Sequence, residues 1–306
     1  MPDTKQIRFG VAGWSYPHWD ASVFPRPRPR GFDRLRYLSR YFDTIEINST
    51  FYGHVRPEVA RLWLERVRDN PDFRFTAKLN RKFTHERLLD EREVRAFLRG
   101  LRPLANAGRL GCVLMQFPWS FKFTEENRDF FIRLRRAFSE FPLVAEMRHG
   151  SWLREEALGL FIDYQVGFCN IDQPQRQSAM APAACLTSSI GYVRLHGRGY
   201  GQWFQGFEEP PRELARRDYL YTGSELAEWK QRVDHIARFA DSVYFVTTND
   251  EGGRSVVNAL QMQSLYAGAH QQAPRALART YRRELAGFKP DGPVQDTLFE
   301  AARAVA

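Results

Sequence analysis

The chain has 306 residues, of which 43% are hydrophobic and 14% aromatic. A chain with this much apolar material can bury a large core, so its composition excludes a wholly disordered protein. The 45 Lys and Arg residues outnumber the 36 Asp and Glu residues and give a formal net charge of +9. An excess of this size attracts nucleic acid or anionic metabolites, although an ordinary basic enzyme can carry the same charge.

The three cysteines Cys112, Cys169 and Cys185 are too widely spaced for a zinc knuckle or a redox pair. The amino-terminal segment is polar, and no stretch approaches the roughly 20 apolar residues that a membrane span needs. We therefore expect a cytoplasmic protein with reduced thiols and no membrane partner.

Short apolar runs alternate with longer segments of helical period, which is typical of parallel β/α units. Strands are expected at residues 8–13, 44–50, 74–78, 111–117, 143–148, 166–172, 190–197 and 242–249. Apolar residues at helical spacing occupy the segments 32–42, 58–68, 91–104, 126–138, 225–239 and 254–266. A doubly wound open sheet uses the same unit, but no Gly-rich phosphate loop follows the first strand. The pattern predicts a single-domain (β/α)₈ TIM barrel over residues 1–288.

Two expected connections are long enough to carry function. Residues 172–189, after strand six, are rich in Pro and Ala, and residues 197–223, after strand seven, are rich in Gly, aromatic residues and Arg. The second connection is expected to be a lid or binding loop, or else surface packing. Residues 289–306 are expected to form a flexible linker and a carboxyl-terminal peptide.

Polar side chains gather at the carboxyl ends of the expected strands. In a barrel, alternate side chains point inward, and those near the carboxyl ends line the mouth where reactions occur. The candidates are Glu46, Asn48, Lys78, Gln116, Glu146, Arg148, Asp172, Arg194, His196 and Asn249. Barrel interiors are normally filled with Val, Ile and Leu, so these charges indicate either a reaction site or internal ion pairs that close the barrel.

The charge types suggest how such a site would work. Glu46 and Glu146 are candidates for general acid and base, and His196 is a candidate for a proton relay. His85 and His149 follow strands three and five and are further catalytic candidates.

Other polar and aromatic residues are expected to bind the substrate. Lys78, Arg148 and Arg194 can clamp an anionic group, Arg in a bidentate manner and Lys as a point charge. The remaining expected substrate contacts are Trp14, Asn48, Tyr52, Gln116, Asp172 and Asn249.

A divalent metal such as Zn²⁺ or Mn²⁺ is an alternative feature of the same site. Its ligands would be Glu46, Glu146, Asp172 and His196, which have suitable donor atoms. No HxxxH or HxH spacing supports such a site, and cations at the same strand ends would repel the ion. The sequence therefore leaves a metal cofactor open.

These residues lie in stretches that resemble the YecE-like family, known as domain of unknown function 72. The stretches include Gly13-Trp14-Ser15-Tyr16, Glu46-Ile47-Asn48-Ser49-Thr50-Phe51-Tyr52, Lys78 with Thr84-His85, Gln116-Phe117-Pro118, Glu146-x-Arg148-His149 and Arg194-x-His196-Gly197-Arg198. The resemblance covers roughly residues 8–266. It implies a TIM barrel but little about activity, because its similarity to phosphodiester-cleaving barrels is at the level of the fold. The residues Val11-Ala12 and Thr247-Thr248 depart from the family pattern.

The carboxyl-terminal peptide contains Gln295-Asp296-Thr297-Leu298-Phe299. This segment resembles the Gln-x-x-Leu-Phe peptides that dock bacterial replication and repair proteins onto the sliding clamp. Leu298 and Phe299 would be the apolar anchors, and Gln295 would hydrogen-bond at the rim of the pocket. The alternative is a short amphipathic helix that folds back on the barrel.

The basic composition, an Arg-Pro loop and this peptide together favour an enzyme that acts on nucleic acid. Phosphates would contact Arg26, Arg28, Arg30 and Arg198, and the carboxylate pair would hydrolyse a phosphodiester or glycosidic bond. One alternative is an isomerase, lyase or hydrolase that acts on a sugar or sugar phosphate. Another is a non-catalytic barrel that binds nucleic acid.

Overall fold

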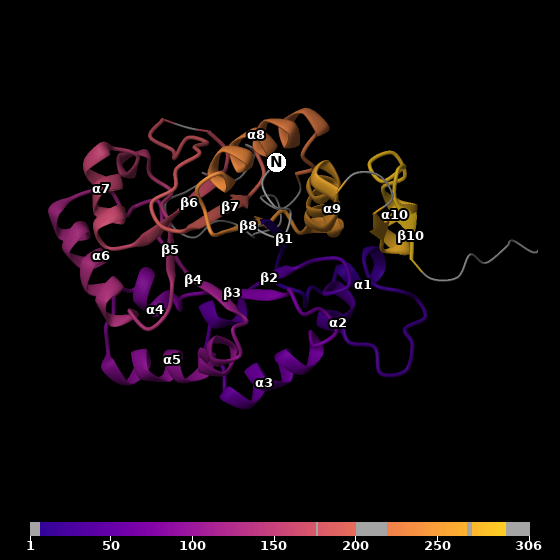
Figure 1. Cartoon of the computed structure of the whole chain (residues 1–306), viewed down its shortest axis with the longest axis horizontal. Helices are drawn as coiled ribbons and strands as arrows, with labels where there is room; N and C mark the ends of the chain where they lie inside the picture. The colour runs from indigo at the N-terminus through magenta and orange to yellow at the C-terminus, as the bar shows by residue number, and fades with distance from the viewer. Residues whose placement is uncertain (1–6, 176, 200–218, 268–270, 292–306) are drawn as a thin grey trace, which may run out of the picture.

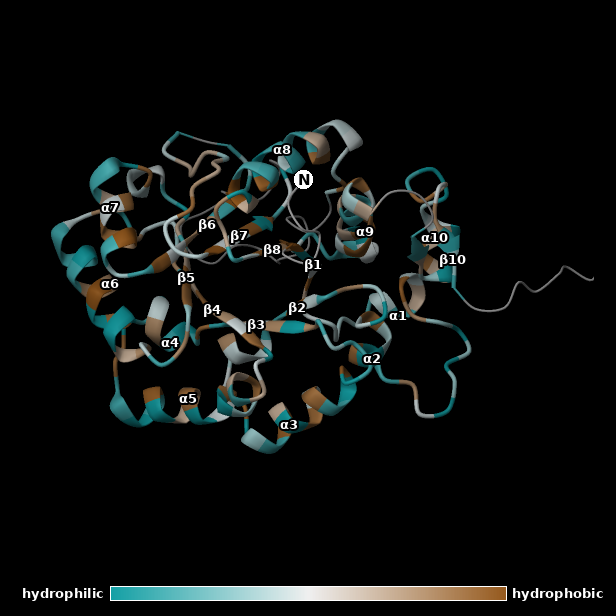
Figure 2. Cartoon of the chain, viewed as in Figure 1, coloured by the Kyte–Doolittle hydropathy of each residue, from teal (hydrophilic) through white to brown (hydrophobic). Residues whose placement is uncertain are grey.

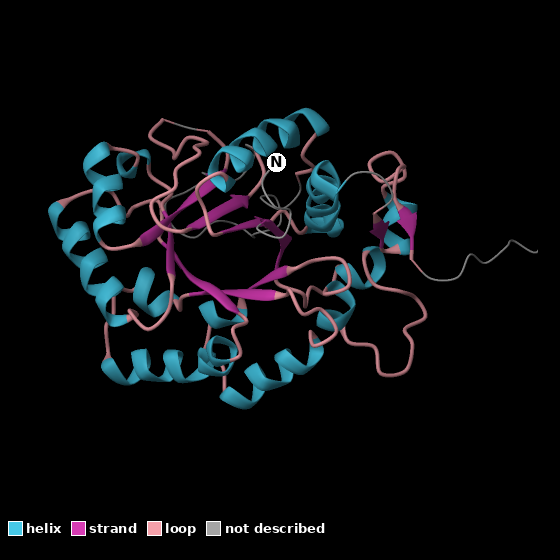
Figure 3. Cartoon of the chain, viewed as in Figure 1, coloured by secondary structure: helices cyan, strands magenta, loops and turns pink. Residues whose placement is uncertain are grey.

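The computed structural model describes residues 7–175, 177–199, 219–267 and 271–291. Eight parallel strands close into a barrel in chain order, with helices around it (Figures 1 and 3). The strands are β1 (Ile7–Ala12), β2 (Thr44–Ile47), β3 (Arg74–Lys78), β4 (Leu110–Gln116), β5 (Leu143–Glu146), β6 (Val166–Asp172), β7 (Ile190–Leu195) and β8 (Ser242–Thr247). The barrel closes where β1 pairs with β8, from Ile7 opposite Val243 to Val11 opposite Thr247. The predicted TIM barrel is confirmed.

The connections carry the expected helices, whose apolar stripes Figure 2 shows in brown. The expected helices are α2 (Arg34–Leu38), α3 (Pro57–Arg66), α5 (Glu91–Asn106), α6 (Glu125–Ala137), α8 (Gly223–Ala237) and α9 (Arg254–Ala267). The structure adds α7 (Glu155–Asp163), which was not expected, and the short α1 (Trp19–Ser22) and α4 (Arg81–Thr84). Several begin at a side chain that accepts hydrogen bonds from free backbone N–H groups: Asp90 caps α5, Thr124 caps α6, and Thr222 forms a capping box with Glu225 in α8. The described part of the long connection between β6 and β7 contains no helix.

Two tyrosines, Tyr192 and Tyr244, lie inside the barrel below Glu46. The rings of Tyr192 and Tyr244 lie with centroids 6.0 Å apart, and the Tyr192 hydroxyl donates a 2.9 Å hydrogen bond to Glu46 Oε2. Gly111 makes room for this packing, because a Cβ there would lie 2.2 Å from the Tyr244 hydroxyl oxygen. Aromatic rings thus fill the interior up to Glu46, and the site lies at the carboxyl ends of the strands above them.

The carboxyl-terminal part packs beside α1 and α9 as β9 (Gln272–Ala273), α10 (Arg275–Thr280) and β10 (Lys289–Pro290) (Figure 1). The Asp291 carboxylate accepts hydrogen bonds from the hydroxyls of Tyr41 (2.5 Å) and Tyr37 (2.9 Å) and from Arg275 N (2.8 Å). The compact region therefore extends at least to Asp291, three residues beyond the boundary expected at 288.

Two expected features lie outside the described residues. They are the peptide with Gln295, Leu298 and Phe299, and residues 200–218 of the loop after β7. Among the helices that the structure describes, none combines the length and apolar character needed to cross a bilayer.

Candidate active site

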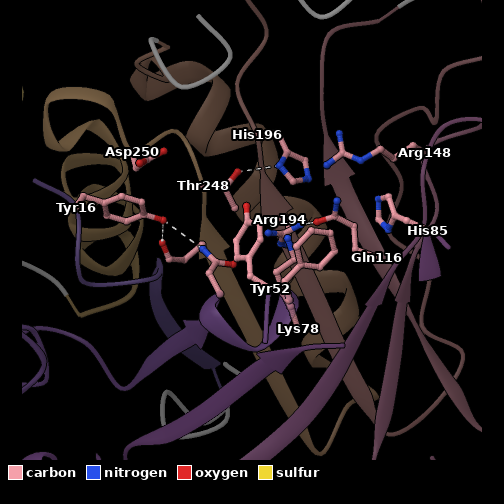
Figure 4. A pocket seen from close by; sticks show the side chains of 13 residues that line it. Tyr16, Tyr52, Lys78, His85, Gln116, Arg148, Arg194, His196, Thr248 and Asp250 are labelled. Atoms are coloured by element: carbon pink, nitrogen blue, oxygen red, sulfur yellow. Dashed lines mark hydrogen bonds between the residues drawn. The ribbon is translucent and has the colours of Figure 1, made fainter. Parts of the chain in front are cut away.

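A pocket of about 430 Å³ opens at the carboxyl ends of the barrel strands. It is lined by Ala12, Tyr16, Asn48, Phe51, Tyr52, Lys78, His85, Gln116, Arg148, Arg194, His196, Thr248 and Asp250. Figure 4 shows Tyr16 and Asp250 on one side of the pocket and Arg148 and His85 on the opposite side. Eight of the residues expected from the sequence meet here, namely Asn48, Tyr52, Lys78, His85, Gln116, Arg148, Arg194 and His196.

A buried arginine joins the two glutamates beneath the pocket. Arg194 Nη2 lies 2.8 Å from Glu46 Oε1, while Arg194 Nη1 bonds to Glu146 and lies 3.1 Å from Gln116 Oε1. Both glutamates are 0% exposed, and the Arg194 side chain is 3% exposed. Each carboxylate thereby has a charged partner that compensates for its removal from water.

Glu146 has two further partners at the pocket edge. Its Oε1 lies 2.9 Å from Arg148 Nη2 and 3.2 Å from His196 Nε2. Burial opposes ionisation of Glu146, but Arg194, His196 and Arg148 together hold its pKa well below the usual value. The carboxylate is therefore ionised and surrounded by partners from β7 and from the segment after β5.

The two histidines that line the pocket are neutral near pH 7. Burial lowers the pKa of His196 to about 3 despite the adjacent Glu146 carboxylate, and its Nδ1 lies 2.8 Å from Thr248 Oγ1. Burial and the neighbouring Lys78 lower the pKa of His85 to about 4. Each ring can therefore donate and accept a hydrogen bond at the same time.

Lys78 stands apart from the ion pairs. Its Nζ lies 4.1 Å from the centre of the Phe51 ring, in a cation–π contact. Among the described residues, no carboxylate lies within ion-pair distance of this ammonium. Burial and the positive charge of Arg194 lower the pKa of Lys78 to about 8.

The distribution of charge favours an anionic ligand. On one side, the cations Lys78, Arg148 and Arg194 outnumber the carboxylates Glu46 and Glu146 by one charge, while the carboxylate of Asp250 lines the opposite side (Figure 4). The cations line the pocket, whereas Glu46 and Glu146 lie buried below it. A ligand in the pocket therefore meets mainly positive charge on this side.

The model of the family described as "Protein of unknown function DUF72" matches residues 8–282. The chain belongs to this family. The resemblance seen in the strand-end motifs is therefore confirmed.

Relatives in this family match most or part of this chain. UPF0759 protein YunF of Bacillus subtilis is 27% identical over 289 residues, which cover 89% of this chain and 99% of YunF. UPF0759 protein YecE of Escherichia coli K12 is 32% identical over 117 residues, 38% of this chain and 39% of YecE. The crystal structure of a DUF72 protein from Thermotoga maritima is 28% identical, with a TM-score of 0.72 and coverage of 86% of this chain and 99% of that one.

In our chain, two of the expected site residues, Asp172 and Asn249, face away from the barrel interior. Asp172 accepts hydrogen bonds from Trp229 Nε1 on α8 (2.6 Å) and from Arg198 Nε (2.9 Å). Asn249 donates to Asn258 Oδ1 on α9 (2.9 Å) and is fully buried. The expectation that Asp172 and Asn249 contact the substrate therefore needs correction: Asp172 lies on the outer face of β6, and at the end of β8 it is Thr248, not Asn249, that lines the pocket.

Trp14 and His149 also lie outside the pocket lining. The Trp14 ring packs edge-on against Trp63 of α3, with centroids 5.4 Å apart. His149 Nδ1 accepts a 3.1 Å hydrogen bond from Ser151 N and caps the short helix η3 (Gly150–Trp152). Both residues therefore hold local structure next to the site.

Three of the four arginines expected to bind nucleic acid have acidic or carbonyl partners. Arg26 Nε donates to the Asp20 backbone oxygen (2.7 Å), and Arg28 forms an ion pair with the Asp20 carboxylate. Arg198 pairs with Asp172 and, at 2.9 Å, with Glu225. Arg30 is exposed. Two of these four arginines, Arg28 and Arg198, are thus paired with carboxylates.

The donor set considered for a divalent metal does not come together. Asp172 faces α8, and the Arg194 guanidinium binds both Glu46 and Glu146. The part of the chain that the structure describes has no group of three His, Cys, Asp or Glu side chains able to hold a metal ion. These residues therefore do not fit the metal site considered from the sequence.

Sequence reasoning missed Tyr16, Phe51, Thr248 and Asp250 as pocket residues. Tyr16 reaches the pocket because the chain turns sharply at Gly13, where φ is +81° and a Cβ would lie 2.8 Å from the Tyr16 hydroxyl. The Tyr16 hydroxyl accepts a 3.2 Å hydrogen bond from Asn48 Nδ2. A glycine directly after the first strand was the available signal for this turn.

Proposed function

We propose that this chain is an enzyme that acts on a small anionic metabolite bearing hydroxyl groups, such as a sugar phosphate or a sugar acid. The observation that carries the proposal is the pocket of about 430 Å³ with Lys78, Arg148 and Arg194 in its lining and both glutamates buried beneath it. Small-molecule sites commonly measure roughly 300–1,000 Å³ and concentrate a few polar groups. Shifted pKa values in such a cleft support catalysis as well as binding.

The two sides of the pocket suit the two ends of such a substrate. Arg148 has a side chain 10% exposed, and its contact with Glu146 fixes its guanidinium at the pocket wall. A phosphate or carboxylate would bind there and near Lys78. Tyr16 and Asp250 lie on the opposite side of the pocket (Figure 4). Together with Asn48, they offer hydrogen-bonding groups for the hydroxyls of a sugar.

Hydrolysis of nucleic acid by the carboxylate pair receives less support. Glu46 and Glu146 are fully buried and bound to Arg194, so neither is positioned to contact a scissile bond as general acid or base. Outside the pocket, the carboxylate partners of Arg28 and Arg198 reduce the charge available to a phosphate backbone. A small ligand explains the enclosed cations more directly.

Isothermal titration of anions tests the proposal. We expect glycerol phosphate and gluconate to bind at one site, and Arg148→Met to weaken binding about tenfold or more, because a charge-assisted hydrogen bond contributes about 1.5–3 kcal/mol. Arg30→Met is the matched control, because it removes the same charge at an exposed position and leaves the pocket intact.

A single-stranded oligonucleotide serves as the competing ligand. We expect its binding to be weak and steeply salt-dependent, with no selective loss in Arg148→Met. The proposal is overturned if the oligonucleotide binds more tightly than every small anion and depends on Arg148, or if no small anion binds.

A further inference from the structure

Lys78 is the pocket cation whose position is not explained by ion pairing. It is the last residue of β3, and its backbone oxygen accepts a 2.7 Å hydrogen bond from Thr50 Oγ1, which fixes the end of the strand. Its ammonium lies over the Phe51 ring and lines the pocket. The nitrogen is therefore held by an apolar face and remains directed at the space that a ligand would fill.

The nearby carboxylates are committed to other cations. Arg194 binds Glu46 and Glu146, and Arg148 takes the remaining side of Glu146. Lys78 is close enough to Arg194 and Arg148 to feel their charge, and Glu46 and Glu146 act on it in the opposite sense, but neither glutamate forms an ion pair with it. A lysine needed only to neutralise these glutamates would be expected within ion-pair distance of one of them.

This environment increases the neutral fraction of the Lys78 amine. Burial, followed by Arg194, lowers the pKa of Lys78 to about 8. At pH 7 about a tenth of the side chain is then neutral, roughly 200- to 300-fold more than for an exposed lysine. The neutral amine is the form that attacks a carbonyl carbon, and lysines beside other cations in apolar pockets are the ones used for this chemistry.

We propose that Lys78 is a catalytic nucleophile that forms an imine with an aldehyde or ketone group of the substrate. The nitrogen lone pair forms the new C–N bond while the carbonyl π electrons move to oxygen, which takes up a proton as the nitrogen releases one. The carbinolamine hydroxyl then leaves with a second proton as water, and the nitrogen lone pair forms the C=N bond. One amine, one carbonyl and one proton thereby give one protonated imine and one water.

This inference rests on the proposed function and names its substrate class. The anion would bind at Arg148, and the carbonyl carbon would lie at Lys78 in the same pocket. The His85 ring is nearly perpendicular to the Phe51 ring, with centroids 5.2 Å apart. Because Lys78 also contacts Phe51, His85 and Lys78 line the same part of the pocket. The substrate class is therefore a small oxo acid or a keto or aldehyde sugar phosphate.

Reductive trapping tests the imine. The wild-type chain is incubated with pyruvate, glyoxylate or dihydroxyacetone phosphate and sodium cyanoborohydride, and the adduct is located by peptide mass spectrometry. We expect at least one probe to label Lys78 more than about tenfold faster than any other lysine, because the neutral fraction of the other amines is far smaller. The labelling rate should rise with pH and level off above about pH 8.

Two variants accompany the trapping. Lys78→Arg keeps the positive charge but cannot form an imine, so it should lose the adduct. Lys122→Gln is the matched control, because Lys122 is an exposed lysine that also lies over an aromatic ring, 5.8 Å from the centre of Trp119. It should leave labelling at Lys78 unchanged.

The outcomes separate this inference from the proposed function. Binding of glycerol phosphate without a Lys78 adduct from any of the three probes overturns the imine and leaves the anion site standing. Labelling spread evenly over surface lysines overturns the imine as well. Absence of both anion binding and the adduct overturns both proposals. The position of the adduct in the wild-type chain tests imine formation at Lys78 even if the Lys78→Arg variant does not fold.

Discussion

Arg194 and Glu46 form an ion pair inside the barrel, with Arg194 Nη2 2.8 Å from Glu46 Oε1 and both side chains shielded from solvent. The other guanidinium nitrogen binds Glu146. Removal of Arg194 would leave the buried Glu46 carboxylate without its ion-pair partner and Glu146 with Arg148 as its remaining arginine partner, so the desolvation cost of both carboxylates would be less well offset. This side chain therefore stabilises the fold as well as shaping the floor of the pocket.

We expect Arg194→Met to lower the free energy of unfolding by about 3–5 kcal/mol, the usual cost of leaving a buried charge without its partner. The triple variant Arg194→Met, Glu46→Gln, Glu146→Gln should regain part of this loss, because it removes the buried negative charges. Equilibrium unfolding in urea measures both changes. Arg30→Met, at an exposed site, should remain within about 0.5 kcal/mol of wild type. An unchanged stability of Arg194→Met would contradict the bridging role.

Asp172 has a different role from the one expected from the sequence. It joins β6 to α8 through Trp229 and to Arg198 in the segment after β7. We expect Asp172→Asn to lower the free energy of unfolding by about 1.5–3 kcal/mol, because it removes charge-assisted hydrogen bonds. Anion affinity should stay within about twofold, because Asp172 does not line the pocket.

Glu228→Gln is the control for this prediction. Its carboxylate lies 3.9 Å from Arg198 and is 57% exposed, so its loss should change stability by less than about 1 kcal/mol. Urea unfolding and anion titration of the two variants give the comparison. A large loss of anion affinity in Asp172→Asn with normal stability would show that Asp172 contributes to ligand binding after all.

The strands could be predicted because their chemistry is local. Runs of apolar and β-branched residues mark each strand, and residues two apart share a face, as Arg194 and His196 do where both line the pocket. Alternation alone does not say which face is inside. In β6 the last polar residue, Asp172, lies on the outer face, where the indole of Trp229 provides a partner from a distant part of the sequence.

The ion pairs within the site could not be predicted because their partners are far apart in the sequence. The sequence left open a reaction site or internal ion pairs, and the structure contains internal pairs beneath a pocket lined by further cations. Arg194 and Glu46 are 148 positions apart, and only barrel closure brings them together. Thr248 and Asp250 were missed because Asn249, between them, was the more conspicuous polar residue at the end of β8.

Asp291 anchors the carboxyl-terminal part through three hydrogen bonds that its carboxylate accepts from Tyr37, Tyr41 and the Arg275 backbone. Burial raises the pKa of Tyr41, and Asp291 adds to the rise, so the hydroxyl remains protonated and able to donate. We expect Asp291→Ala to lower the free energy of unfolding by about 2–3 kcal/mol. Asp69→Ala, whose side chain is 70% exposed, should change it by less than about 0.5 kcal/mol in the same urea experiment. Equal effects of the two variants would contradict the anchoring role.

Acid should destabilise the barrel partly through His85. Burial and then Lys78, Arg148 and Arg81 lower its folded pKa to about 4, although Glu146 opposes the shift, whereas the unfolded side chain titrates near 6.5. The unfolded chain therefore binds a proton first as the pH falls from 6.5 to 4, and the free energy of unfolding decreases through that window.

Comparison of His85→Gln with wild type isolates this contribution. Between pH 7 and pH 5 we expect wild type to lose about 1 kcal/mol more than His85→Gln, roughly half of what the full shift gives, because solvent reaches part of the ring. The variant retains the background from His196, whose pKa is also lowered by burial, so that the difference reports His85 alone. Urea unfolding at the two pH values provides the measurement. Parallel losses in both proteins would mean that His85 is protonated as easily in the folded chain as in the unfolded one.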